Sequence, residues 1–93
     1  MKIVYRPHLK QRLKERKFPD DYPHKIYKEA KLKLFDTQTK HYIAIAKMKY
    51  AAKLRSLSIS YDKIKGNIEI ITIHPISDED IESRIKSKRW RKI

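Results

Sequence analysis

Three side chains near the amino terminus have the types and the spacing of a phosphate-binding site. His8, Arg12 and Arg16 recur every four residues, the interval that places side chains on one face of an α-helix. An arginine presents several N–H donors to a phosphate group, and an imidazole exchanges protons near neutral pH. Exposed ion pairs add little stability, so pairing with Glu15 would be a weak structural reason for two arginines. We therefore expect Arg12 and Arg16 to contact phosphates.

Basic residues gather at both ends of the sequence. The 93 residues include 24 Lys and Arg against 11 Asp and Glu, which gives a net charge of +13. Residues 1–17 hold seven cations and one acid, and residues 84–93 hold six cations and no acid. An excess of this size favours polyanionic partners, because neutralised phosphates release counterions. We expect the two segments to meet on one nucleic-acid-binding face, to which residues beyond the His8 stripe contribute: Lys10, Arg84, Lys86, Lys88, Arg89, Trp90 and Arg91.

Trp90 and the charge each have a second interpretation. An indole can stack on an unpaired base, but the same side chain can instead anchor a helix end in the core. Enrichment in Lys, Glu and Ile is also typical of thermophilic proteins. The charge would equally suit a protein whose partner is an acidic protein.

Several classes of chemistry lack the residues they need. The chain has no cysteine, which excludes disulfides, thiolate zinc sites and cysteine nucleophiles. His24 and His41 stand alone in polar contexts, so the histidines have no metal-ligand spacing. The sequence has no glycine-rich phosphate loop, no G-x-S-x-G motif and no paired carboxylates. We therefore expect no metal or other cofactor, and neither nucleotide hydrolase, esterase nor glycosidase activity.

No apolar segment approaches the roughly 20 residues that a membrane-spanning helix needs. The longest, residues 42–46, has five. The first residues also lack the apolar core of a secretory signal. We therefore expect a cytoplasmic protein without a membrane partner.

The elements that must position these side chains form one α+β domain. A chain of this length has room for a single core. Leu9 and Leu13 supply the inner face of the first helix, and Ser77 can cap the last one. The pattern predicts a short strand at residues 2–6, helices at 7–17 and from a cap at Asp20 to residues 29–31, a mainly antiparallel sheet of four strands at 31–35, 40–50, 54–61 and 68–74, and a C-terminal helix from Ser77.

The strand at residues 54–61 shows the clearest alternation. Leu57, Ile59 and Tyr61 share one face, and the serines at 56, 58 and 60 share the other. This period of two predicts one packed face and one face in water.

Two of these segments resemble a known family. The pattern H-x-x-x-R-x-x-x-R from His8, together with an apolar strand that carries Thr72 and stops at Pro75, resembles the small domains related to BrnT. The order of the elements is similar to that of the RelE-like superfamily of toxin ribonucleases. BrnT-like toxins usually carry an arginine in the strand before the last helix, whereas the nearest arginine here is Arg84. The resemblance implies a single RelE-like domain over residues 1–93.

The resemblance also implies an mRNA-cleaving toxin, with an acidic antitoxin that would cover its cationic face. Attack by the 2′-hydroxyl of RNA needs a base, cations around the phosphorus and an acid for the leaving oxygen. His8 or His74 would act as base or acid, and Tyr61 as a further proton donor. Arg12 and Arg16 would hold the phosphate, and no metal is required. His74, at a strand end, also suits a structural hydrogen bond, as His8 suits a surface position.

The sequence leaves three functions open. The first is a toxin-type, metal-independent endoribonuclease of the RelE and BrnT kind. The second is a non-catalytic protein that binds the phosphates of RNA or DNA through its basic ends, with RNA favoured over DNA. The third is a protein whose charge meets an acidic protein partner.

Overall fold

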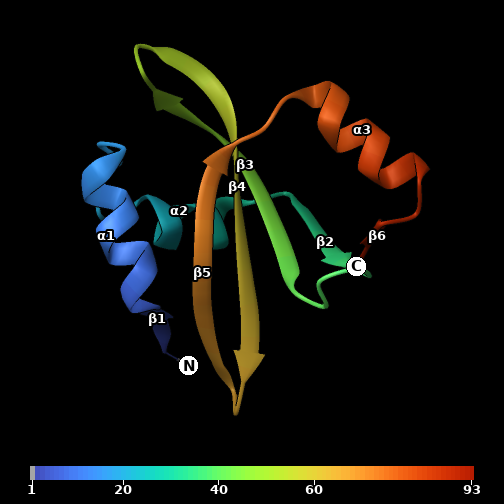
Figure 1. Cartoon of the computed structure of the whole chain (residues 1–93), viewed down its shortest axis with the longest axis horizontal. Coiled ribbons are helices and arrows are strands. Elements are labelled where there is room, and N and C mark those ends of the chain that lie inside the picture. The colour runs from blue at the N-terminus through green and yellow to red at the C-terminus, as the bar shows by residue number, and fades with distance from the viewer. Residues whose placement is uncertain (1) are drawn as a thin grey trace.

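Three helices and six strands make up residues 2–93, the part of the chain that the computed structural model describes. The predicted α+β class is therefore confirmed. None of the helices in these residues is long and apolar enough to cross a membrane. Figure 1 shows the elements, whose order is β1 (Ile3–Tyr5), α1 (Pro7–Glu15), α2 (Tyr22–Glu29), β2 (Leu32–Asp36), β3 (Tyr42–Tyr50), β4 (Lys53–Ile64), β5 (Asn67–Pro75), α3 (Asp78–Lys86) and β6 (Trp90–Lys92).

One sheet contains all six strands, in the order β1-β5-β4-β3-β2-β6. Neighbouring strands run antiparallel, except that β1 lies parallel to β5. The expected sheet of four strands is therefore wrong, because a three-residue strand extends it at each edge. The four longer strands, β2 to β5, match the predicted segments.

β6 replaces the end of the expected terminal helix. α3 ends at Lys86, and Lys88 takes a left-handed conformation with φ of 63°. The chain then turns so that Trp90–Lys92 pairs with β2. Three residues are too few to show a period of two, so the sequence pattern does not distinguish this strand from the helix before it.

The helices begin at proline and serine residues. Pro7 and Pro23 lie in the first turns of α1 and α2, where a missing N–H removes no helical hydrogen bond. Ser77 Oγ accepts a hydrogen bond from a first-turn amide of α3 at 3.1 Å, as predicted. The predicted cap at Asp20 is wrong. Asp20 lies in a turn, and Asp21 takes the N-cap position of α2 without a capping side-chain hydrogen bond.

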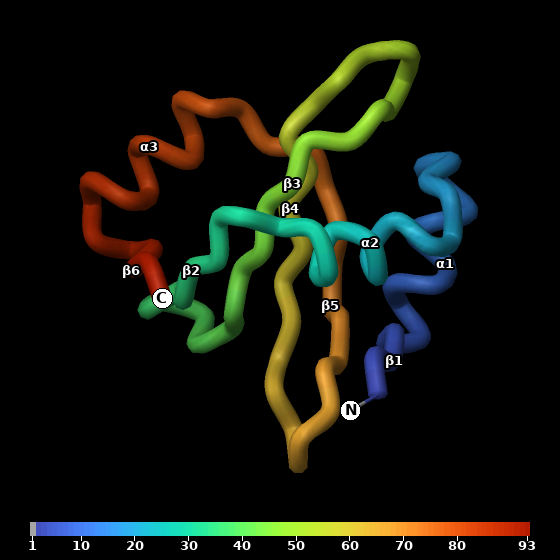
Figure 2. Tube along the Cα trace, turned by 180° about the vertical axis from the view of Figure 1, so that it is seen from behind, coloured from blue at the N-terminus to red at the C-terminus, as the bar shows by residue number. Residues whose placement is uncertain are grey.

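The two faces of the sheet pack against different helices. α1 and α2 cover one face, with α2 in front of the sheet in Figure 2. Leu9, Leu13 and Ile26 of these helices are buried against β4 and β5. α3 packs on the other face, where a smaller buried cluster gathers at the β2 side of the sheet: Leu34, Ile43, Ile45, Ile76, Ile81 and Trp90.

The serine face of β4 is not simply open to water. Ser58 is 1% exposed, and its neighbours at 56 and 60 are half-buried. The expectation of a wet face is wrong here because α3 and the segment leading into β6 form a wall beside these serines. Ile59 and Tyr61 are buried on the opposite face, as predicted.

Candidate nucleic-acid site on the α3 face

A pocket of about 310 Å³ lies over the middle of the sheet, on the face that carries α3. Strands β3, β4 and β5 form its floor, and α3 and the segment leading into β6 form its wall. Its lining is rich in groups that exchange protons or bind anions. The polar residues of the lining are Asp36, Thr39, His41, Ser58, Ser60, Thr72, His74, Arg84 and Arg89.

Strand register fixes the hydroxyl groups of the floor. Ser60 is the partner of Thr72 across β4 and β5, and their hydroxyl oxygens lie 2.6 Å apart. Ser58 is the partner of His74 and donates a hydrogen bond to its carbonyl oxygen at 3.3 Å. Alternation along a strand puts Ser58 and Ser60 on the same face, so His74 stands beside a polar floor.

His74 is half-buried, and Arg84 of α3 lines the same pocket. Burial lowers its pKa, and the charges of Arg84, Arg16 and Arg12 lower it further. Both effects disfavour the imidazolium form. At neutral pH, His74 is therefore a neutral imidazole that can accept a proton.

One side of β5 is unpaired near His74, and α1 lies along this strand. In the described chain, β1 pairs with β5 only at Ile68, Glu69 and Ile70, so the carboxyl-terminal half of β5 has β4 on one side and no strand on the other. α1 packs along β5 instead. Arg12 lies on α1 and Arg16 is its C-cap residue, and the charges of both help to lower the pKa of His74.

His41 is the second imidazole of the pocket. Its Nδ1 lies 2.6 Å from Asp62 Oδ1, and Arg6 donates to the other oxygen of that carboxylate at 3.1 Å. A carboxylate only accepts hydrogen bonds, so Nδ1 of His41 carries the proton and Nε2 is left for another partner. The sequence pattern leaves His41 isolated. The pairing of Tyr42 with Tyr61 brings it beside Asp62, and that register was the one signal that could have found it.

Trp90 is an anchor and not a stacking platform. Its side chain is 3% exposed, and Nε1 donates to Asp36 Oδ2 at 3.1 Å. Arg89 forms an ion pair with the same carboxylate at 3.2 Å. Burial alone would raise the pKa of Asp36, but hydrogen bonds from Arg89, Trp90 and two backbone amides outweigh it and lower the pKa to about 2. The structure thus contradicts base stacking by Trp90 and ties Arg89 to Asp36.

Tyr61 lies on the other face of the sheet. It is 1% exposed, stacked on Tyr42 and in edge contact with Tyr27 of α2. Burial raises its pKa to about 12, and Tyr27 and Tyr42 contribute. Its expected role as a proton donor beside His74 is therefore wrong, because the ring belongs to the core between β4 and α2.

The other predicted residues are spread over the surface. His8 is exposed at the start of α1. Lys10 lines a small hollow at the connection between α1 and α2. Three further cations are exposed at the end of α3 or beyond it: Lys86, Lys88 and Arg91.

The two basic ends of the chain do not meet as whole segments. β1 and β6 are the opposite edges of the sheet, and Figure 1 shows the two termini on different sides of it. The expectation of one common face is therefore wrong: α1 and α3 pack on opposite faces of the sheet, and Arg91 and Lys92 lie on β6 at the edge far from β1. Arg84 is the carboxyl-terminal cation that acts on His74 together with the α1 arginines. The site is accordingly smaller than expected.

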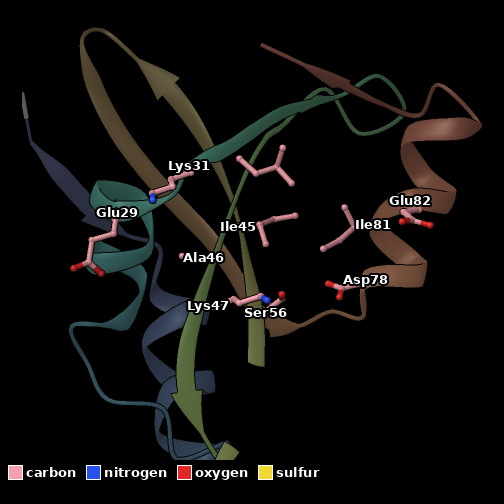
Figure 3. A pocket seen from close by; sticks show the side chains of 10 residues that line it. Glu29, Lys31, Ile45, Ala46, Lys47, Ser56, Asp78, Ile81 and Glu82 are labelled. Carbon is pink, nitrogen blue, oxygen red and sulfur yellow. The ribbon is translucent and has the colours of Figure 1, made fainter. Parts of the chain in front are cut away.

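A larger groove, of about 640 Å³, lies between α3 and β3 (Figure 3). Ile45 and Ile81 give it an apolar base. Its charged lining consists of Glu29, Lys31, Lys47, Asp78 and Glu82. Because carboxylates outnumber ammonium groups there, the groove suits a phosphate less well than the pocket at His74 does.

Comparison with known proteins yields no match, whether to a family model, to a curated protein or to a solved structure. The resemblance to BrnT-related and RelE-like domains therefore stays a prediction. Among residues 2–93, no group of three or more His, Cys, Asp or Glu side chains is arranged to hold a metal ion.

Proposed function

We propose that the chain binds RNA through the arginines around His74 and cleaves it there, as a metal-independent endoribonuclease of the RelE and BrnT kind. The observation that carries the proposal is one pocket that holds the half-buried His74 beside Arg84 and the hydroxyls of Ser60 and Thr72, while the charges of Arg12 and Arg16 also reach His74. Like charges gathered in one place repel one another. An anionic ligand such as a phosphate would relieve that repulsion, so the arrangement suits binding better than stability.

The chemistry of the pocket favours RNA over DNA. A neutral His74 can accept the proton of a 2′-hydroxyl, a group that DNA lacks. The arginines would bind the phosphate and stabilise the negative charge that develops on its oxygens. Ser60 and Thr72 would offer hydrogen bonds to the sugar or to a base. These groups together support attack of the 2′-oxygen on the adjacent phosphorus.

A non-catalytic protein that binds RNA or DNA is the second candidate. The exposed cations away from His74 support it, because they would contribute phosphate contacts without chemistry. The burial of Tyr61 supports it as well, since one expected proton donor is absent from the pocket. An acidic protein partner, such as the antitoxin that the resemblance implies, would compete with nucleic acid for the same cations.

Incubation of the purified protein with labelled single-stranded RNA and its all-deoxy counterpart tests the proposal. We expect cleavage of the RNA alone. His74→Gln and Arg84→Ala should abolish cleavage, whereas His24→Gln, at an exposed position of α2, should not. Binding of both strands without cleavage would support the non-catalytic function, and absence of binding would refute both functions.

A further inference from the structure

The pocket holds an imidazole that the proposed base leaves unused. His41 lines the same hollow as His74, and its side chain is 33% exposed. Asp62 of β4 holds the ring through Nδ1, so Nε2 is available to a ligand. Cleavage of RNA needs a proton donor for the leaving oxygen as well as a base for the nucleophile.

The two imidazoles stand on either side of the hydroxyl pair at Ser60. His74 is at the level of Ser58 on β4, and Asp62, which holds His41, lies four residues further along that strand. Four residues of strand span about 13 Å. His41 and His74 line one pocket together with Ser60. A phosphate seated there would have one ring on the side of the nucleophile and one on the side of the leaving group.

The charged groups nearest the two rings have opposite signs. His74 shares its pocket with Arg84 of α3, and burial together with the charges of Arg84, Arg16 and Arg12 favours its neutral form. His41 faces the carboxylate of Asp62, whose second oxygen binds Arg6. Asp36, the carboxylate that lines the pocket, is bound by the arginine that precedes β6. The pocket therefore contains His74, which can accept a proton, and His41, which is hydrogen-bonded to a carboxylate.

We infer that His41 is the general acid of the proposed cleavage and that Asp62 positions it. The 2′-oxygen bonds to the adjacent phosphorus and loses its proton to His74. The bond from phosphorus to the 5′-oxygen breaks, and that oxygen takes the Nε2 proton of His41 in its doubly protonated form, which leaves the neutral ring with its Nδ1 proton on Asp62. The products are a 2′,3′-cyclic phosphate and a 5′-hydroxyl, so the substrate class is single-stranded RNA with free 2′-hydroxyls. The assignment rests on the proposed function.

A substrate with sulfur in place of the bridging 5′-oxygen tests the assignment, because a thiolate leaves without a proton. His41→Gln should slow cleavage of the oxygen substrate about 10²- to 10⁴-fold and leave cleavage of the sulfur substrate nearly unchanged. His74→Gln should slow both. The ratio of the two rates does not depend on the folded fraction, so partial unfolding of a variant cannot imitate the result.

Two further variants complete the experiment. Asp62→Asn should give a smaller loss on the oxygen substrate and the same rescue by sulfur, since the ring remains but is free to turn. His24→Gln should behave as wild type on both substrates. Equal losses on both substrates for His41→Gln, or no loss on either, would overturn the assignment and leave the proposed function intact. A wild-type protein that cleaves neither substrate would overturn the proposed function, and the assignment with it.

Discussion

The two faces of β4 differ in what their side chains do for the molecule. Ile59 and Tyr61 point toward α1 and α2 and are buried in the larger core. Ser58 and Ser60, on the opposite face, form the polar floor beside His74. Burial of apolar surface stabilises the fold, whereas a hydrogen-bonded hydroxyl adds little. A single alternating strand therefore separates residues that hold the fold together from residues placed to meet a ligand.

Matched truncations on the two faces should show the largest difference in stability. Ile59→Ala removes a fully buried side chain and should lower the free energy of unfolding by about 2–5 kcal/mol. Ser60→Ala breaks one hydroxyl pair and should cost about 1 kcal/mol. Urea denaturation measures both. Similar losses in the free energy of unfolding for the two variants would contradict the distinction between the faces.

The contribution of Asp36 to stability on the α3 face should be lost at low pH. Asp36 has a folded-state pKa of about 2, below its ordinary value of 3.8. Its stabilisation is therefore complete above about pH 4 and is lost as the pH falls through about 2. We expect Asp36→Asn to be less stable than wild type at neutral pH, with the gap closing as the pH falls from 4 to 2. Thermal unfolding across this range measures the gap, and a gap that stays constant would contradict the anchor.

The titration of His74 tests the charged surroundings of the pocket and does not require that the protein be active. Burial and the three arginines lower its pKa, so NMR should find the midpoint below the ordinary histidine value of 6.5. Arg84→Ala removes one positive neighbour and should move the midpoint upward. Arg91→Ala, on β6, is the matched control and should leave it in place. A midpoint that stays the same in Arg84→Ala would mean that the charge of Arg84 does not affect this imidazole.

The smallest expected effect is in the salt dependence of RNA binding. Each phosphate contact contributes about 0.7 to the slope of log affinity against log salt for a single strand. Arg12→Ala should reduce the slope by about this amount, and Arg91→Ala, at the far edge of the sheet, should change it less. Equal changes would indicate a diffuse binding surface, contrary to a site at His74.

Local patterns predicted much of the fold and only part of the site. Helical spacing identified the buried Leu9 and Leu13 of α1, whereas the helix ends at Glu15, so Arg16 follows it as the C-cap residue. These features depend on neighbours within one turn of helix. Pairings between distant segments were beyond such patterns. Trp90 is buried because Asp36, 54 residues away in sequence, accepts its N–H.

The errors in the expected site have two causes. Alternation along β4 already predicts Tyr61 on the packed face with Ile59, so its role as a proton donor conflicts with a local pattern. The sequence pattern leaves His41 isolated because its partner Asp62 is 21 residues away and lies beside it only through strand register. The parallel pairing of β1 with β5 likewise leaves no trace in a strand of three residues.

The most direct test of the account is the location of bound RNA on the sheet. Isotope-labelled protein is titrated with a single-stranded RNA whose 2′-hydroxyls are methylated, which prevents cleavage, and the amide shifts are followed by NMR. The account predicts the largest changes at Thr72, His74 and Arg84 and on α1 near Arg12, with little change at Arg91. Changes concentrated on β6 or α2 would contradict it.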